Sequence, residues 1–224
     1  MNSSIRNITL LFVATLLTIG NASAQEIDDE PAERQKVSVG ALVGANISGM
    51  RASLPQGKFS TKASIGGEIC LFTEYHINRT WGTRLTIAPA MERTGWIAGQ
   101  TKSEMMSTGV LDIVLGATIR LPAGEHFWTI GLGPYSRFVV GGAMDGEGQW
   151  PYTLQVGQDS ITGEPWYAMD KFGSGFAVFA GFESQRGLMV HAEVRAGLTN
   201  ILNLETYHGR LWPYKAVLAV GQRF

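Results

Sequence analysis

The last eleven residues of the chain, Tyr214 to Phe224, alternate with period two between mostly apolar side chains and side chains that are small or cationic. In an extended strand this alternation places the apolar side chains on one face, and Lys215 and Arg223 on the other. A strand of this kind that ends in an aromatic residue is typical of the closing strand of a bacterial outer-membrane β-barrel. Since lipid offers no water to an open sheet edge, this strand must pair with the first strand. Phe224 is the residue that the barrel-assembly machinery is expected to read.

The start of the chain predicts export. Arg6 precedes an apolar run from Ile8 to Ile19, and Ala22-Ser23-Ala24 has the small-x-small pattern of a cleavage site. These features predict a secretory signal peptide over residues 1–24. The apolar run is shorter than the ~20 residues that a membrane-spanning helix needs, which disfavours an N-terminal anchor. Residues 25–36 are expected to form a flexible lead-in, and residues 37–224 the barrel domain.

Composition narrows the function classes. The mean hydropathy is only +0.04 although 45% of the residues are hydrophobic, as expected when apolar and polar residues alternate. The net charge of −1 offers no basic surface for a nucleic acid. Cys70 is the single cysteine, and no zinc-type spacing is present, so neither a disulfide nor a metal or other cofactor is expected.

Eight runs of residues alternate with period two, and they predict the strands of an all-β, antiparallel up-and-down transmembrane barrel. Most of these runs reach the ~9–11 residues that a tilted transmembrane strand needs. The predicted strands are Val37–Gly49, Ser64–His76, Thr80–Arg93, Met105–Leu121, His126–Gly142, Lys171–Gln185, Gly187–Asn200 and Tyr214–Phe224.

The connections between these runs alternate between short and long. Such alternation predicts short turns on the periplasmic side, long loops on the extracellular side, and both ends of the barrel in the periplasm. A hairpin around Tyr152–Val156 in the longest loop would raise the strand number from eight to ten. The short turns are Ile77–Arg79, Pro122–Glu125 and Ser184–Arg186, and the long loops are 50–63, 94–104, 143–170 and 201–213.

The charged side chains of the predicted strands lie opposite the apolar face. An eight-stranded barrel has room inside only for its own side chains, and charges buried there must be paired. The sequence therefore predicts a lumen filled by an ion network of nearly neutral charge. Its expected members are Glu68, Glu74, Glu92, Asp112, Glu183, Glu193, His191, Arg84, Arg120, Arg137, Arg195, Lys215 and Arg223.

Five short motifs span essentially the whole mature chain. They are V-S-V-G-A-L-V-G-A-N-I-S-G at Val37–Gly49, F-T-E-Y-H-I-N-R-T-W at Phe72–Trp81, G-L-G-P-Y at Gly131–Tyr135, G-L-T-N-I at Gly197–Ile201 and V-G-Q-R-F at Val220–Phe224. Together they resemble the PorT-like outer-membrane β-barrel family of the Bacteroidota, which is related in architecture to small OmpX-type barrels. Gln222 stands where that family usually has an aromatic residue. The resemblance implies a location and a fold, but not an activity.

One constellation of residues suggests catalysis. His191, Glu193 and Arg195 share one face of a predicted strand, and some outer-membrane barrels are hydrolases or acyltransferases. Catalysis needs a nucleophile that is hydrogen-bonded to the base, and the sequence sets no such distance for Ser174 or Thr199. His191 also lies near the predicted periplasmic turn. We therefore expect these residues to belong to the ion network, and no catalytic site.

The longest loop, residues 143–170, is rich in aromatic residues. Trp150, Tyr152, Trp166 and Tyr167 would sit well at the membrane–water interface, which is one interpretation. Trp150 and Trp166 lie several residues from either strand end, however, and aromatic faces supply contact area at a low entropic cost. The alternative is therefore a contact surface for an extracellular glycan, lipid or protein.

Three hypotheses about function remain open at this point. The favoured one is a non-enzymatic barrel with a structural or surface-interaction role, whose partners are the lipid of the outer membrane and the barrel-assembly machinery. The second is a membrane-embedded hydrolase or acyltransferase, which requires a catalytic dyad near the extracellular rim. The third is a narrow pore or an accessory of a secretion machine, which requires a continuous water path.

Overall fold

The computed structural model describes residues 36–53, 59–98, 103–145, 149–158, 165–202 and 209–224. The predicted signal peptide and all but the last residue of the lead-in lie outside these ranges. Within them, no helix is long and apolar enough to cross a membrane.

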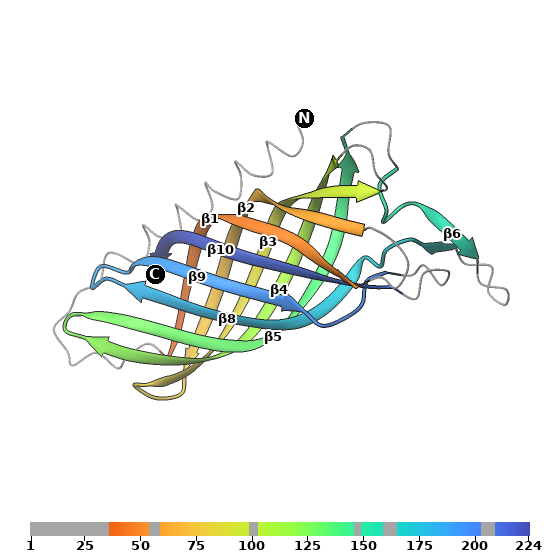
Figure 1. Ribbon diagram of the computed structural model, residues 1–224. Helices are drawn as coiled ribbons and strands as arrows, with labels where there is room; N and C mark the ends of the chain where they lie inside the picture. Colours follow the sequence, from red (N-terminus) through yellow and green to blue (C-terminus); the bar gives the residue numbers. More distant parts are fainter. Residues whose placement is uncertain (1–35, 54–58, 99–102, 146–148, 159–164, 203–208) are drawn as a thin grey trace. The chain divides into compact units, whose positions relative to one another are not determined.

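Eight strands form a closed antiparallel barrel in which each strand pairs with its neighbours in sequence (Figure 1). The prediction of an eight-stranded up-and-down barrel is confirmed. The barrel strands are β1 (Val37–Ser53), β2 (Phe59–His76), β3 (Trp81–Ala98), β4 (Ser103–Ala123), β5 (His126–Met144), β8 (Phe172–Glu183), β9 (Leu188–Gly197) and β10 (Arg210–Arg223).

The barrel is closed by the pairing of its first and last strands. The ladder between β1 and β10 runs from the pair Gly40–Arg223 to the pair Ser53–Arg210. This pairing meets the requirement that the sequence of the closing strand implies, because it leaves no strand edge open to lipid. Phe224 follows directly after β10 in the chain.

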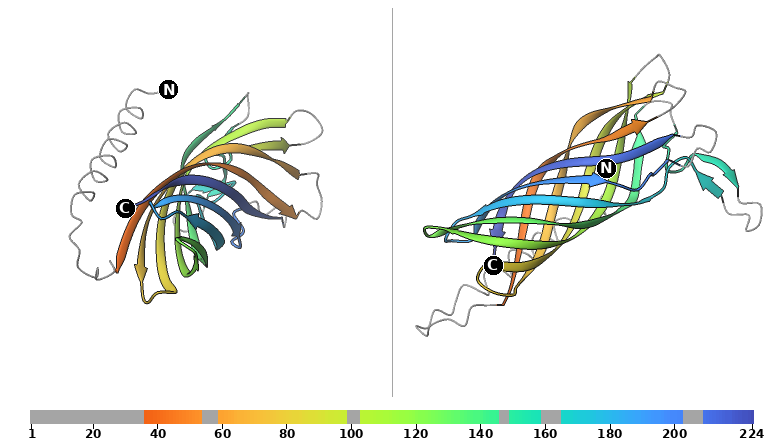
Figure 2. Two further views of the ribbon diagram at one scale, coloured as in Figure 1. Left: turned by 90° about the vertical axis from the view of Figure 1, so that its left-hand side faces the viewer. Right: turned by 60° about the horizontal axis from the view of Figure 1, so that its bottom comes forward.

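A two-stranded hairpin lies in the long connection between β5 and β8. Its strands are β6 (Gln155–Gln158) and β7 (Pro165–Tyr167), and they pair only with each other. The hairpin extends away from the barrel, as Figure 1 and the right-hand view of Figure 2 show. The expected hairpin near Tyr152–Val156 is therefore present in part, but it does not join the barrel wall, and the barrel does not have ten strands.

The two ends of the barrel differ in their connections. One end, called the turn end below, has the three tight connections that join β2 to β3, β4 to β5, and β8 to β9. Gly124 and Gly187 adopt φ angles of 65° and 79° in two of these turns, which favours glycine at both positions. In the third turn, the Asn78 side chain accepts hydrogen bonds from the backbone N–H groups of Thr80 and Trp81, at 2.9 and 2.8 Å. The opposite end is called the loop end.

Most strands, but not β8 and β9, extend further at the loop end than the sequence predicted. Much of the predicted loops 50–63 and 94–104 is strand, because β1 ends only at Ser53 and β2 already begins at Phe59, while β3 ends at Ala98 and β4 begins at Ser103. The predicted bounds follow the runs of alternating residues, whereas a ladder can continue beyond such a run as long as its backbone groups stay paired. Strand β10 likewise begins at Arg210 rather than at Tyr214, whereas β9 already ends at Gly197.

The outer wall of the barrel carries a continuous apolar belt. Each barrel strand contributes at least one large, exposed aliphatic side chain, and a soluble monomer rarely exposes so large an apolar surface. The exposed Lys, Arg, Asp and Glu side chains described on the barrel strands are cations that all lie at the loop end: Arg51, Lys62, Arg93 and Arg210. Representative belt residues are Val43, Ile65, Ile87, Leu115, Leu132, Val178, Val194 and Leu218.

Candidate functional site

The lumen of the barrel is filled by side chains in successive layers, and Arg195 lies at the centre of the most highly charged one. Its guanidinium group contacts three carboxylates, with Nη2 at 2.6 Å from Glu68, Nη1 at 2.6 Å from Asp112, and Nε at 2.6 Å from Glu193. These residues come from β2, β4 and β9, so the contacts cross the lumen. All four side chains are buried.

Lys215 and Arg137 complete the positive charge of this layer. The Lys215 Nζ lies 2.6 Å from Glu68 and 3.2 Å from Glu92, and it also contacts Asp112. Arg137 forms a two-point contact with Glu92, in which Nη1 lies 3.1 Å from Oε1 and Nη2 contacts Oε2. Bidentate pairing of this kind is the strongest form of the arginine–carboxylate interaction. We call the group formed by Glu68, Glu92, Asp112, Glu193, His191, Arg137, Arg195 and Lys215 the central cluster.

His191 and Cys70 lie at the edge of the central cluster. The His191 Nε2 lies 3.1 Å from a Glu193 oxygen, and the Cys70 thiol donates to Glu68 at 3.1 Å. The cluster also brings four carboxylates together with three cationic side chains. The side chains of all these residues are shielded from solvent.

A second ion cluster closes the turn end of the lumen. Glu74 accepts hydrogen bonds from Arg84 Nη2 at 2.7 Å and from Arg223 Nη2 at 3.0 Å. Arg223 Nε also lies 3.0 Å from Glu183, and Arg120 Nη2 lies 2.9 Å from the other oxygen of Glu183. We call these five residues the turn-end cluster. Together, the two clusters contain every acid and base that the sequence assigned to the lumen.

An apolar layer separates the two ion clusters. Along β2, the inward-facing residues read Glu74, Phe72, Cys70 and Glu68, so that the layer lies between the carboxylates of the two clusters. Phe72 contacts the turn-end cluster, with its ring centroid 4.6 Å from the Arg84 guanidinium carbon. The buried residues of this layer are Leu42, Cys70, Phe72, Ala88, Met189, Val217 and Ala219.

A larger apolar cluster fills the loop end of the lumen. It combines inward-facing residues of the wall with residues of the long connection between β5 and β8 and with Ile201 of the connection between β9 and β10, and we call it the cap. The chain at Trp150 turns back on itself, since the Trp150 carbonyl accepts hydrogen bonds from the N–H groups of Thr153 and Leu154. The buried members of the cap are Met50, Ala90, Met106, Val110, Val139, Trp150, Tyr152, Met169, Ile201 and Leu211.

The structure contradicts the expected contact surface for Trp150 and Tyr152. Trp150 is 9% exposed and Tyr152 is fully buried, so neither side chain is available to a partner. Trp150 lies against the backbone of Gly142, where a Cβ atom would come within 2.5 Å of the indole ring. Burial raises the pKa of the Tyr152 hydroxyl to about 12, although nearby Arg137 opposes this shift. Both aromatic rings therefore belong to the apolar packing at the loop end of the lumen.

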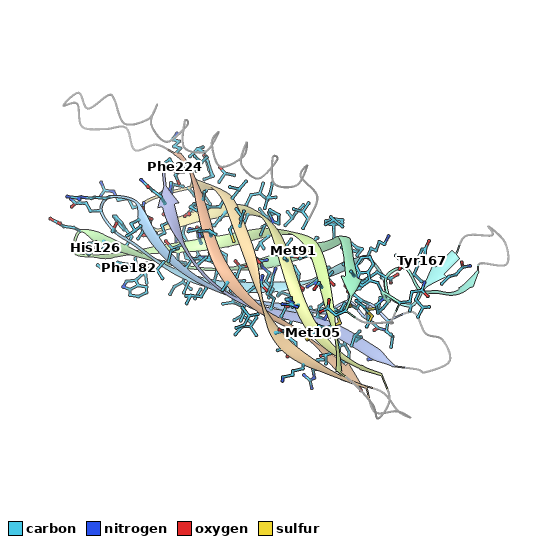
Figure 3. All side chains as sticks on the ribbon, turned by 90° about the horizontal axis from the view of Figure 1, so that it is seen from above. Met91, Met105, His126, Tyr167, Phe182 and Phe224 are labelled. Atoms are coloured by element: carbon cyan, nitrogen blue, oxygen red, sulfur yellow. The ribbon has the colours of Figure 1, made fainter. Side chains whose placement is uncertain are left out.

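The other two predicted contact residues lie on the hairpin. Tyr167 of β7 is 37% exposed, and it lies well away from the turn-end residues His126 and Phe182 (Figure 3). The Lys171 ammonium group lies 5.8 Å from the centroid of its ring. The side chain of Trp166 is outside the described residues.

The groups considered for catalysis are engaged with each other. His191 contacts Glu193, which in turn contacts Arg195. Ser174 and Thr199 share a hydrogen bond of 2.6 Å between their hydroxyl groups. In the part of the chain that the structure describes, no three His, Cys, Asp or Glu side chains are grouped so that they could hold a metal ion.

The sequence analysis did not predict the cap, the apolar cluster at the loop end of the lumen. Its wall residues continue the same inward-facing, period-two series as the charged residues, as Asp112, Val110 and Met106 of β4 illustrate. The change from charged to apolar residues along this series was the signal that could have predicted the wall part of the cap. The contribution of Trp150 and Tyr152 has no comparable signal, because they lie in a connection without periodicity.

The barrel is similar to solved structures of small bacterial outer-membrane proteins, whereas no family model and no curated protein matches the sequence. The outer membrane protein OprG from Pseudomonas aeruginosa is 12% identical, with a TM-score of 0.52 over 84% of this chain and 96% of OprG. The attachment invasion locus protein Ail of Yersinia pestis is 14% identical, with a TM-score of 0.43 over 85% of this chain and all of Ail. Neisserial surface protein A is 12% identical, with a TM-score of 0.42. The likeness to OprG establishes that this chain has the fold of a small outer-membrane β-barrel.

Proposed function

We propose that the protein is an integral β-barrel of the bacterial outer membrane with a closed lumen, which has a structural or surface-interaction role and is neither a channel nor an enzyme. One observation carries this proposal: charged and apolar side chains fill the lumen from one end to the other. The turn-end cluster, the apolar layer, the central cluster and the cap lie in series, and each of them includes residues from several strands.

The outer wall supports the proposed location. A belt of aliphatic residues surrounds the barrel, and aromatic side chains border it towards both ends, such as Trp128 near the turn end and Phe138 further along the same strand. We further propose that the chain is a PorT-like barrel, on the basis of its sequence motifs. We also infer the orientation from the connections. The turn end, with its short turns, faces the periplasm, and the loop end faces outwards.

The long connection between β5 and β8 supports a role at the cell surface. Its two ends are anchored in the cap through Trp150, Tyr152 and Met169. Its middle part, the β6–β7 hairpin, extends beyond the barrel. A connection that served only to complete the cap would not need a hairpin that extends beyond the barrel. The hairpin is therefore the part of the chain that we assign to contact with an extracellular glycan, lipid or protein.

Conductance tests the closed lumen. The refolded barrel, reconstituted in a planar lipid bilayer, should show no steady current. A variant in which residues 149–170 are replaced by a short Gly-Ser linker should also remain closed, because the central cluster belongs to the wall. A steady current through the unmodified barrel would contradict the proposed function and favour a pore.

Protease treatment of intact cells tests the orientation. Proteinase K added outside should cut within Gln155–Tyr167. The cut barrel should still migrate as one folded species on a denaturing gel before boiling, and it should separate into two fragments after boiling. Cleavage that requires prior permeabilisation of the outer membrane would place the hairpin in the periplasm and rule out a surface role.

A further inference from the structure

A groove opens on the outer wall at the loop end of the barrel, where β9 and β10 separate. It has a volume of about 770 Å³, which lies within the ~300–1,000 Å³ typical of ligand sites. The residues that define it are Arg51 of β1, Gly197 at the end of β9, Leu198 just beyond it, and Trp212, Pro213 and Tyr214 of β10.

A proline in the wall produces the groove. The last residue pair between β9 and β10 is Ala196–Tyr214, although β10 continues to pair with β1 as far as Arg210. The backbone N–H and C=O groups of Leu211 face the chain that follows β9, since they bond Asn200 and Ile201. By the two-residue period of a strand, the backbone nitrogen of Pro213 faces the same way, and it has no hydrogen to donate. The ladder therefore ends at this position.

The groove has an apolar lower part and a cationic upper part. Leu198 and Tyr214 are exposed on the outer wall, and the apolar belt continues below them through Val194 and Leu218. Arg51 lies further towards the loop end, since it pairs with Trp212 whereas Gly49 pairs with Tyr214. The apolar part of the groove thus lies on the side of the membrane core, where a lipid has its acyl chains. The cationic part lies on the side of the membrane surface, where a lipid has its headgroup.

The charge at the upper part of the groove is positive and available. Among the residues that the structure describes, no Asp or Glu lines the groove. Within the described residues Arg51 forms no ion pair, whereas Arg93, an exposed arginine at the same end, lies 3.5 Å from Asp145. An arginine beside an aromatic residue at the membrane interface suits a phosphate group, which accepts two parallel hydrogen bonds from a guanidinium group.

We propose that this groove binds one membrane lipid whose phosphate headgroup carries a net negative charge. Its acyl chain lies along Leu198 and Tyr214 and then enters the apolar belt. Its phosphate contacts Arg51 beside the Trp212 ring. Lipid is the occupant because the groove opens on the lipid-facing wall and is continuous with it.

Lipid retention in native mass spectrometry tests this proposal. The barrel in a neutral detergent is mixed with equal amounts of dimyristoylphosphatidylglycerol and dimyristoylphosphatidylcholine. One phosphatidylglycerol molecule should be retained per barrel in preference to phosphatidylcholine. Arg51→Gln should lower this preference about threefold to fivefold, as expected for a partly exposed charge pair. Lys62→Gln is the matched control, because Lys62 is exposed at the same end but does not line the groove.

A second variant tests the position of the acyl chain. Leu198→Glu places a carboxylate in the lower part of the groove and should reduce the retention of both lipids, while heat-dependent gel migration shows that the barrel has folded. Equal retention of the two lipids by the unmodified barrel would overturn the proposal. An equal loss of preference in the Lys62 and Arg51 variants, or undiminished retention in the Leu198 variant, would also overturn it.

Discussion

The central cluster and the cap both fill the lumen with buried side chains, but they depend on different parts of the chain. The central cluster is built entirely from strands of the closed wall, and its charges contact each other across the lumen. The cap joins wall residues to Trp150, Tyr152 and Met169 of a connection between strands. Charges held by the wall cannot move apart without breaking ladders, whereas a connection can move while the wall stays intact. The central cluster should therefore determine the stability of the barrel, and the cap its access from outside.

The largest effect should come from Arg195→Met. This change leaves Glu68, Asp112 and Glu193 without their shared cation, and the removal of one partner from a buried ion pair costs ~3–5 kcal/mol. We expect the free energy of unfolding to fall by about this amount, or assembly to fail. Urea unfolding in phospholipid vesicles, followed by tryptophan fluorescence, measures the change.

The matched control for this experiment is Arg120→Met in the turn-end cluster. The Arg120 side chain is 22% exposed, so water can compensate Glu183, and the loss should be about 1 kcal/mol. If both variants lose the same free energy of unfolding, the claim that the central cluster determines the stability of the barrel is contradicted.

Trp150→Ala should have a smaller effect on the barrel and a clear effect on the cap. Truncation of a buried aromatic residue in a rigid core lowers the free energy of unfolding by ~3–5 kcal/mol. Because the connection can move into the cavity that the indole ring leaves, we expect a smaller loss of about 2–3 kcal/mol. We expect faster proteolysis within residues 149–170, with the gel migration of the unheated barrel unchanged. If the unheated barrel no longer migrates as a folded species, the cap is required for the wall, and the separation of roles is wrong.

The smallest effect should come from Tyr152→Phe. Among the described residues, the buried Tyr152 hydroxyl has no hydrogen-bond partner. Removing an unpaired polar group from an apolar site is nearly neutral or slightly stabilising, within ~1 kcal/mol. Urea unfolding of the cap, monitored by proteolysis, measures this. A loss above ~2 kcal/mol would mean that the hydroxyl is bonded and that the cap is partly polar.

The sequence predicted the wall and the inward position of the charges, because both follow from period two. Glu68 and Arg195, for example, face inwards whatever their partners are. Their contact could not be predicted, since it joins residues 127 positions apart and depends on the stagger of the strands around the barrel. The burial of Trp150 depends on the space at Gly142, which no local pattern indicates. The groove was missed because Pro213 was assigned to a loop rather than to β10.

Labelling of Cys70 tests most directly whether the lumen is closed. Cys70 is the single cysteine of the chain and is fully buried in the apolar layer between the two ion clusters. In vesicles, a charged, membrane-impermeant methanethiosulfonate should leave Cys70 of the folded barrel unlabelled, and it should label Cys70 completely after unfolding. The control is Ser53→Cys combined with Cys70→Ser. Because Ser53 is exposed, this variant gives the labelling rate of an accessible thiol. Labelling of Cys70 in the folded barrel at a comparable rate would show that water passes through the lumen and would contradict this account.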